Sequence, residues 1–190
     1  MHIWNTMSGR KEELSLPEGG KPLRLFVCGP TVYNRIHIGN ARVYIFFDTF
    51  AHYLRTRGIK LFYLQNITDI DDKIIARAEE EHVTPQKLAQ KYTRMFLKNM
   101  RALRITAVTK YASATGFIPE IIAQINRLIQ KGHAYKIESD GWYFDLKTFP
   151  DYGKLAGRTV EQAEDGVSRI DVSEKKRNRG DFCLWKFADT

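Results

Sequence analysis

Residues 28–42 read Cys-Gly-Pro-Thr-Val-Tyr-Asn-Arg-Ile-His-Ile-Gly-Asn-Ala-Arg, and this stretch predicts where a strand gives way to a helix. Residues 23–29 form a short apolar run between turn residues, which is typical of a buried strand. Apolar residues then recur at helical spacing over residues 40–54, and Gly58 stands where a C-terminal cap belongs. A tight turn therefore leads from the strand into a helix that starts within residues 37–40.

The pattern continues to about residue 114. We predict a second strand over residues 60–65, two helices over residues 71–81 and 84–103, and a third strand over residues 105–111. Thr84 and Pro85 open the second of these helices as its N-cap and first helical residue. This order is typical of a Rossmann-like, doubly wound α/β sheet with parallel strands. Such a sheet binds ligands at the carboxyl ends of its strands, beside helix N-termini.

A different pattern, of the α+β kind, follows over residues 115–190. A helix is predicted over residues 117–131, and residues 135–146 read as a hairpin that turns at Ser139-Asp140-Gly141. The rest is loop-like, with a basic segment at residues 171–180. We therefore expect one α/β domain over residues 1–114 and a second domain over residues 115–190. Before the first strand, residues 9–22 are turn-rich and predict a loop or a weak hairpin.

The composition limits the class of protein. Lysine and arginine number 30 against 22 acidic residues, so the net charge is +8. This excess fits a polyanionic partner, but charge alone favours the alternative that the basic residues are spread over a solvated surface. The only cysteines, Cys28 and Cys183, make no disulfide framework and indicate a reducing cytoplasm. No apolar run is long enough to span a membrane and no signal peptide is evident, so we expect a cytoplasmic protein with no membrane partner.

Residues 37–40, His-Ile-Gly-Asn, carry the chemistry of the first helix start. A helix N-terminus offers free amides and a positive dipole end to phosphates. His37 can donate a hydrogen bond to a phosphate oxygen and stabilise charge that develops there. Gly39 has no side chain, so a flat base or ribose can lie against the backbone. Taken alone, four residues favour the alternative that a histidine and a glycine merely shape the turn.

Three further blocks follow in order. They are Tyr-Leu-Gln-Asn-Ile-Thr-Asp-Ile-Asp-Asp-Lys-Ile-Ile at residues 63–75, Phe-Pro-Asp-Tyr-Gly-Lys-Leu at residues 149–155 and Asp-Phe-Cys-Leu-Trp-Lys at residues 181–186. With residues 28–42 they make the chain resemble the N-terminal portion of a cysteinyl-tRNA synthetase, a class I aminoacyl-tRNA synthetase. In that family a His-Ile-Gly-Asn form of the HIGH motif follows a Cys-Gly-Pro-Thr-Val-Tyr run. The resemblance covers nearly all of the chain but less than half of a family member.

The resemblance implies a ligase that activates cysteine with ATP and magnesium and transfers it to tRNA-Cys, as a monomer. Residues 1–114 would be the first half of the nucleotide-binding catalytic domain, and residues 115–190 an inserted connective domain. The implied catalytic residues are His37 and Asn40. The implied ATP-binding residues are Pro30, Thr31, Tyr33, His37, Gly39 and Asn40. The implied substrate pocket contains Gly29, Asn66, Thr68, Asp69 and Asp72, although Asp71 and Asp72 fit equally well as first-turn carboxylates of a helix.

Cys28 is the one metal ligand that the resemblance implies. A lone cysteine at a strand end is most often a small buried hydrophobe, and we keep that interpretation for Cys183. In the family, the cysteine before Gly-Pro-Thr helps to hold a zinc ion that binds the substrate thiolate, which a serine hydroxyl cannot match. The other zinc ligands and the KMSKS loop follow the Asp-Phe-x-Leu-Trp-Lys block in the family, so the site is incomplete within these 190 residues.

Two alternative functions and the role of the basic run stay open at this point. A related ligase of thiol biosynthesis joins activated cysteine to an amino-sugar, but such enzymes tend to have histidine where this chain has Asn40. A non-catalytic remnant would bind nucleotide or RNA through its basic surface. The basic run at residues 175–179 fits either a contact with the tRNA acceptor end or a solvated loop. We expect these 190 residues alone to be inactive.

Overall fold

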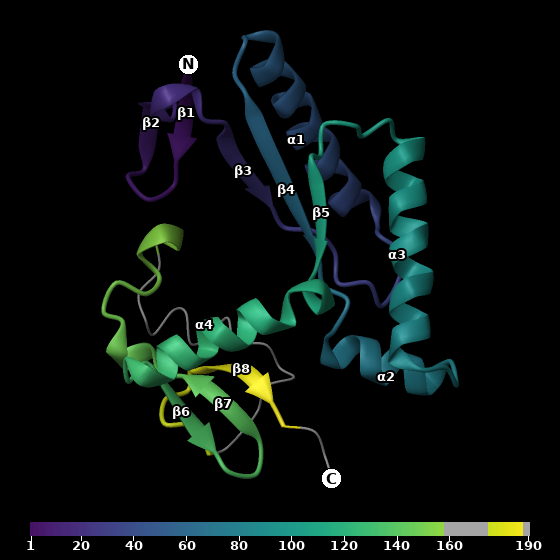
Figure 1. Ribbon diagram of the computed structural model, residues 1–190, viewed down its shortest axis with the longest axis vertical. Helices are drawn as coiled ribbons and strands as arrows, with labels where there is room; N and C mark the ends of the chain where they lie inside the picture. The colour runs from purple at the N-terminus through teal and green to yellow at the C-terminus, as the bar shows by residue number, and fades with distance from the viewer. Residues whose placement is uncertain (158–174, 188–190) are drawn as a thin grey trace. The chain divides into compact units, whose positions relative to one another are not determined.

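The computed structural model describes residues 1–157 and 175–187 (Figure 1). The chain divides into two compact units, one formed by Leu16–Ile118 and the other by Met1–Ser15 together with Pro119–Thr190. The assignment of a catalytic half to residues 1–114 and a connective domain to residues 115–190 stays a prediction. No helix within residues 1–157 and 175–187 is both long and apolar enough to cross a bilayer.

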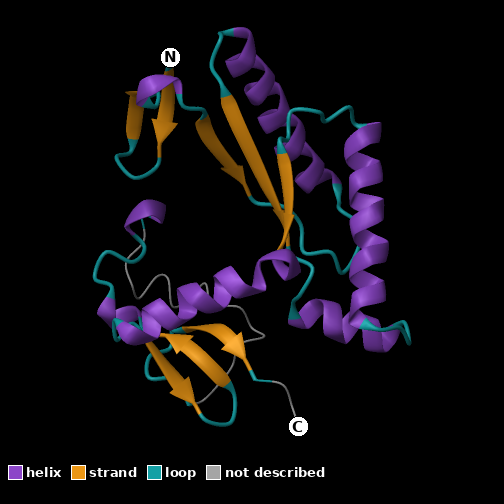
Figure 2. Ribbon diagram, viewed as in Figure 1, coloured by secondary structure: helices purple, strands orange, loops and turns teal. Residues whose placement is uncertain are grey.

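The unit Leu16–Ile118 is built on a parallel sheet. Its strands are β3 (Leu23–Val27), β4 (Leu61–Ile67) and β5 (Lys110–Ser113), in the order β3-β4-β5. Both pairings are parallel, so the strands point the same way in Figure 2. The helices of this unit are α1 (Ile38–Thr56), α2 (Asp72–Glu80) and α3 (Pro85–Ala102). The Rossmann-like expectation is confirmed.

The helix ends follow the predicted capping residues. Gly58 has φ +76° after α1, and Ile59 donates its backbone N–H to the Leu54 carbonyl at 3.1 Å. At the start of α3, Thr84 Oγ1 accepts the backbone N–H of Lys87 at 3.3 Å, with Pro85 as the first helical residue. The first helix begins at Ile38, two residues before the start of the apolar repeat.

The core of this unit lies between the helices and the sheet. Edge-to-face packing of Tyr44 from α1 on Phe96 from α3, with ring centroids 5.8 Å apart, joins the two long helices. The main cluster consists of Val32, Tyr44, Ile67, Ile74, Ala78, Leu88, Ala89, Tyr92, Phe96, Met100 and Ile105. A second cluster of Val27, Ala51, Tyr63 and Ala107 packs the other half of α1 on β3 and β4.

The third strand differs from its prediction. We expected it over residues 105–111, but β5 covers only Lys110–Ser113. Before β5 the backbone is bound by a side chain instead, because Asp48 Oδ1 on α1 accepts the N–H groups of Thr106 at 2.8 Å and Ala107 at 2.7 Å. These amides are therefore not available to a strand ladder, and pairing begins only beyond them.

The second unit is α+β. Helix α4 (Ile118–Gln130) leads into the hairpin of β6 (Ala134–Ile137) and β7 (Gly141–Phe144), which confirms the predicted hairpin and its turn. β8 (Phe182–Lys186), which was not predicted, pairs antiparallel with β7. The N-terminal hairpin consists of β1 (His2–Asn5) and β2 (Arg10–Glu13). The predicted weak hairpin is thus only half right, because the partner of β2 precedes residues 9–22.

Candidate nucleotide-binding site

The predicted site begins where β3 and β4 end. Thr31 and Thr68 form a parallel bridge just past the two strands. Val32 donates its N–H to the Thr68 carbonyl, and Thr68 donates its N–H to the Pro30 carbonyl, both at 3.0 Å. Asn66 Oδ1 accepts the Gly29 N–H at 2.8 Å. The structure therefore brings together Gly29, Pro30, Thr31, Asn66 and Thr68 at the carboxyl edge of the sheet, where ligands of such folds bind.

Gly29 allows this close approach. A Cβ added to Gly29 would lie 1.7 Å from the Asn66 carbonyl oxygen and 2.9 Å from the Asn66 carbonyl carbon. Both atoms belong to the backbone of β4, so they cannot rotate away as the end of a side chain would. Only glycine fits where the turn after β3 crosses the end of β4.

His37 caps α1. Its Nδ1 accepts the Gly39 N–H at 3.0 Å, while the His37 N–H reaches the Asn40 Oδ1 at 3.3 Å, so the two side chains form a reciprocal capping box. Because Nδ1 accepts, the neutral ring carries its hydrogen on Nε2. No hydrogen-bond partner for Nε2 occurs within residues 1–157 and 175–187, and the ring is exposed, so the Nε2–H is available to an external acceptor.

Gly39 has a different neighbour from the one expected. A Cβ on Gly39 would lie 2.6 Å from Cε1 of His37, so the absence of a side chain makes room for the imidazole of His37. We had expected this space to accept a base or ribose. The first turn of α1 contains no acidic residue, so no carboxylate neutralises the positive end of the helix dipole there. The Gly39, Asn40 and Ala41 amides already donate to His37.

The predicted acidic residues separate into different roles. Asp71 is the N-cap of α2 and accepts the Lys73 N–H at 2.9 Å, as one alternative from the sequence proposed. Asp72 is exposed in the first turn of the same helix. Asp69 binds Thr115 through both carboxylate oxygens. Tyr33 is a neighbour of α2, since its ring centroid lies 5.8 Å from Lys73 Nζ.

Cys28 is an exposed free thiol at the end of β3. In the described part of the chain, no three histidine, cysteine or acidic side chains gather as metal ligands would. Protein zinc sites use at least three such ligands, so the described residues do not form one around Cys28. Cys183 lies on β8 and packs against Tyr135, Ile137 and Tyr143, as the small hydrophobe that we expected.

A layer of buried polar groups beneath the site was missed from the sequence. Gln65 is completely buried on β4, and neither its amide oxygen nor its amide nitrogen has a hydrogen-bond partner in the described residues. The same is true of the Tyr63 hydroxyl. Burial, then the neighbouring charges of Cys28 and Tyr111, raise the pKa of Tyr44 to about 12. A glutamine in an apolar strand, two residues after a tyrosine on the same face, was the available signal.

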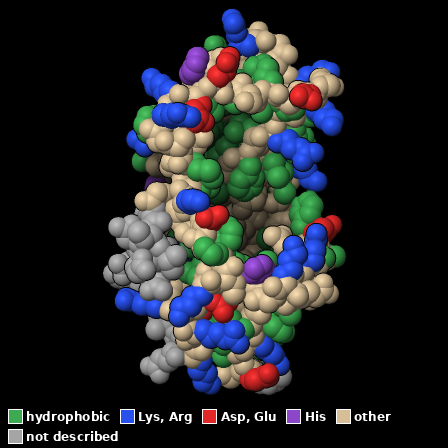
Figure 3. Space-filling model, turned by 90° about the vertical axis from the view of Figure 1, so that its left-hand side faces the viewer, with side chains coloured by type: hydrophobic (Ala, Val, Ile, Leu, Met, Phe, Trp, Pro, Cys, Tyr) green, Lys and Arg blue, Asp and Glu red, His purple; other side chains and the backbone are tan. Residues whose placement is uncertain are grey.

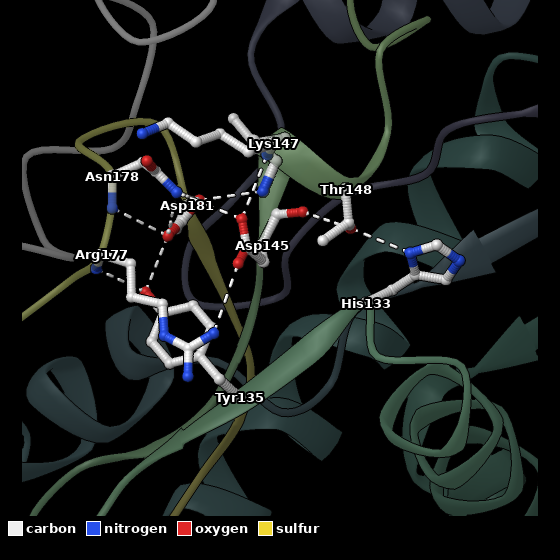
Figure 4. Close-up of polar contacts among 9 residues, drawn as sticks. His133, Tyr135, Asp145, Lys147, Thr148, Arg177, Asn178 and Asp181 are labelled. Carbon is white, nitrogen blue, oxygen red and sulfur yellow. Dashed lines mark hydrogen bonds and ion pairs between the residues drawn. The ribbon is translucent and has the colours of Figure 1, made fainter.

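The described part of the basic segment packs on the β6–β7 hairpin (Figure 4). The Arg177 guanidinium lies over the Tyr135 ring, 4.2 Å from its centroid, and the Arg177 N–H donates to the Tyr135 hydroxyl at 2.9 Å. That hydroxyl donates to the buried Asp181 carboxylate at 2.8 Å. Burial is the main cause that raises the pKa of Tyr135 to about 12. Residues 171–174 of the segment lie outside the described residues.

Basic side chains do not form a single cluster on the face drawn in Figure 3. Lysine and arginine are spread over that face and are interrupted by apolar and acidic side chains. Arg177 is 62% exposed at its side chain although it contacts Asp145 and Tyr135, so its charge still reaches solvent. The face drawn in Figure 3 therefore does not favour a tRNA contact over a solvated loop for the basic run.

The parallel sheet and the capped helix at its carboxyl edge together define an α/β domain of the Rossmann-like class. Residues 16–190 match the family model for the class I (C) tRNA synthetase catalytic domain, so the chain belongs to this family. The chain is 50% identical over 186 residues to the cysteine–tRNA ligase of Thermoplasma acidophilum, covering 98% of this chain and 40% of that protein. It is 48% identical over 188 residues to the Carboxydothermus hydrogenoformans cysteine–tRNA ligase, covering 99% and 40%.

A solved structure resembles the fold at low sequence identity. LeuRS of Agrobacterium radiobacter, in its ternary complex with tRNA and LeuAMS, superposes with a TM-score of 0.56 at 17% identity over 70% of this chain and 18% of that one. This likeness supports the fold alone. The chain spans about 40% of the length of the curated relatives that it matches.

Proposed function

We propose that this chain supplies the HIGH-motif half of the active site of a cysteine–tRNA ligase, which activates cysteine with ATP and magnesium and then esterifies tRNA-Cys. The observation that carries the proposal is the capping box of α1, because it occupies His37 Nδ1 and leaves the exposed Nε2–H without a hydrogen-bond partner in the described residues. The family membership and the identity to cysteine–tRNA ligases over nearly the whole chain support the same reaction.

The roles of the residues follow from charge. In the activation step, negative charge develops on the α-phosphate and on the leaving pyrophosphate. The His37 Nε2–H would donate a hydrogen bond to these oxygens, and the positive end of the α1 dipole would stabilise their charge. Asn40 would hold the His37 backbone through the capping box. Catalysis would then consist of positioning and charge stabilisation, with no protein nucleophile.

The remaining predicted residues would line the binding sites of ATP and of the amino acid. We assign the contact with ATP to Pro30, Thr31, Tyr33 and Gly39. We assign the amino-acid pocket to Gly29, Asn66, Thr68 and Asp72, and we place Asp69 at the edge of this pocket with both carboxylate oxygens bound to Thr115. Both sets lie on the turns after β3 and β4 or on the helix starts that follow them.

Cys28 is the residue of this chain that would help to hold the zinc ion implied by the family. Cys28 is one soft ligand, and the other two or more would have to come from outside the described residues. Zinc analysis of the full-length polypeptide and of its Cys28→Ser variant tests this assignment, because the proposal expects one zinc per molecule that the variant loses.

We propose that the rest of the active site joins the sheet at β3. In the described residues β3 pairs only with β4, and Phe26 on β3 is 58% exposed although it is aromatic. Further parallel strands at this edge would bring a second set of phosphate-binding groups opposite α1. The tRNA would be recognised by the full-length protein, which we expect to act as a monomer in the cytoplasm.

The test is cysteine-dependent exchange of pyrophosphate into ATP by the full-length polypeptide, followed by charging of tRNA-Cys. A cysteine–tRNA ligase gives both activities. A thiol-biosynthesis ligase would give the exchange and then transfer cysteine to an amino-sugar and not to tRNA. RNA binding without any exchange would mean that the protein is a non-catalytic binding module.

A further inference from the structure

A contact at the site edge that the sequence did not predict joins Asp69 to Thr115, 46 residues further on. Asp69 Oδ1 accepts the Thr115 N–H at 2.9 Å, and Asp69 Oδ2 accepts the Thr115 hydroxyl in a short hydrogen bond. Both oxygens of one carboxylate are thus bound to one residue. Hydrogen bonds to an ionised acceptor are roughly twice as strong as those between neutral groups.

Thr115 lies in the 3₁₀ helix η2 (Ala114–Phe117), which directly follows β5. The residue at its own N-cap, Ser113, makes no side-chain capping bond. Asp69 provides that bond from the loop after β4. η2 is also the last segment before Ile118, where the unit Leu16–Ile118 ends.

Asp69 directly follows Thr68, whose backbone N–H and C=O are both hydrogen-bonded to the turn after β3. Thr68 exchanges hydrogen bonds with Pro30 and Val32 of the turn after β3. One loop therefore links the ends of all three parallel strands, to β3 through Thr68 and to β5 through Asp69. Among the hydrogen bonds of the described residues, those of Asp69 are the ones that tie η2 to the loop after β4.

We propose that Asp69 is a positioning residue, which acts on the substrates through Thr115 and not by contacting them. The proposal deepens the function proposed above and rests on it. By fixing η2 to the loop after β4, the carboxylate makes the three strand ends one rigid edge against which cysteine and ATP are aligned. Small displacements of aligned reactants lower the reaction rate strongly. A more mobile edge therefore slows the activation of cysteine while the fold is kept.

The functional test is a double-mutant cycle on pyrophosphate exchange by the full-length polypeptide, with the variants D69A, T115V and the pair. D69A lowers kcat/KM for cysteine by about a hundredfold and T115V by about tenfold, since T115V keeps the backbone donor. The double variant has the same kcat/KM as D69A alone, because both substitutions remove the same contact. T115S, which keeps both donors, restores the wild-type rate. T49V is the matched control, since the Thr49 hydroxyl bonds only within α1.

Direct contact of Asp69 with substrate gives a different result. T115V would then be as active as the wild type while D69A is impaired, and this outcome would overturn the proposal. Multiplying effects in the double variant would overturn it as well. The thermal midpoints of the variants are measured in parallel, and a loss of rate that follows a loss of folded protein counts against a positioning role.

A second measurement does not depend on activity. Hydrogen exchange of residues 114–117 is compared between the 190-residue chain and its D69A and T115S variants. D69A exchanges at least about tenfold faster there, since the Thr115 N–H loses its acceptor, and T115S is unchanged. Equal exchange in all three would disprove the contact. If the full-length polypeptide shows no cysteine-dependent exchange while D69A loses protection, the proposed function has failed and the link itself stands.

Discussion

His37 both ends the turn and presents a donor, and the two roles can be separated by substitution. Asparagine is a good N-cap residue, but it does not reach as far as an imidazole Nε2. We expect H37N to keep the stability of α1 and to lower cysteine-dependent pyrophosphate exchange about a hundredfold in the full-length polypeptide. H37A should lose the rate equally and also cost about 1 kcal/mol of stability, because the Gly39 N–H loses its acceptor.

Both quantities are needed to judge these variants. Urea denaturation gives the stability and the exchange assay gives the rate. An H37N variant with the wild-type rate would remove Nε2 from the mechanism, even if H37A were inactive.

Gly29 is a second residue with a sharp expectation. A methyl group there meets the Asn66 carbonyl oxygen at 1.7 Å, so G29A must push the turn after β3 away from β4. We expect a loss of at least about 2 kcal/mol in the free energy of unfolding. The comparison is G58A, where the added Cβ meets nothing within 4 Å and only the positive φ of 76° is unfavourable, at about 1 kcal/mol. Equal losses of unfolding free energy in G29A and G58A would show that the turn after β3 can move away from β4 at no cost.

The place of a single residue in the structure could be predicted where its hydrogen-bond partner is close in sequence. His37, Gly39 and Asn40 contact one another within four positions, so one short motif contains all the residues of the capping box. Asp48 and Gln65 were not predicted, since their surroundings come from segments distant in the chain. For Asp69 the sequence placed the residue at the correct edge but did not show that Thr115 binds it.

Among the elements, the stretch before β5 depends on one carboxylate. Asp48 Oδ1 accepts two backbone N–H groups, those of Thr106 and Ala107, and both would lose their acceptor in D48A. We expect D48A to lower the free energy of unfolding by about 1–3 kcal/mol. D48N keeps one carbonyl oxygen at the same place and should recover most of that loss. Chemical denaturation of the three proteins measures both, and an undisturbed D48A would mean that water replaces the carboxylate.

The junction of α2 and α3 should respond to pH. Glu81 accepts the Lys91 ammonium at 2.7 Å and the Tyr92 hydroxyl at 3.1 Å, and the Lys91 hydrogen bond is the main cause that lowers the pKa of Glu81 below its ordinary 4.5. A lowered pKa stabilises the fold above about pH 4.5, and this contribution is lost as the pH falls through the lowered value.

The measurement is the thermal midpoint of E81Q against the wild type between pH 7 and pH 3. We expect E81Q to be less stable at pH 7 and the two to converge as the carboxyl group becomes protonated. Glu79→Gln is the control, because Glu79 is exposed on the same helix. A difference that stays constant down to pH 3 would assign the effect to packing and not to charge.

The elements themselves could largely be predicted from periodicity. The long helices α1 and α3 and the parallel strands β3 and β4 repeat their apolar residues often enough to be recognised. β8 was missed because a five-residue strand contains too few repeats and depends on its neighbour β7. The start of β5 was misplaced because Asp48, on another element, takes the amides that precede it.

For the molecule as a whole, we expect the 190-residue chain alone not to catalyse cysteine activation. His37 and α1 supply charge stabilisation from one side only, and losing one such contact typically lowers the rate about a hundredfold. The measurement is pyrophosphate exchange by the purified chain, alone and mixed with the remainder of the polypeptide made separately. Restored exchange in the mixture supports the proposed division, and a rate equal to that of the full-length polypeptide without the remainder contradicts it.

The open side of β3 has a consequence during synthesis. In the proposed full-length enzyme, β3, β4 and β5 leave the ribosome early, and at about 5–20 residues per second the remainder follows only over tens of seconds. For that time, the N–H and C=O groups of β3 that have no strand partner in residues 1–157 and 175–187 can pair with any strand that meets them. Neighbouring nascent chains on one messenger carry the same edge, so sedimentation of arrested nascent chains should detect pairs. The polysome, where identical edges are crowded together, is where this protein runs its greatest risk of pairing with itself.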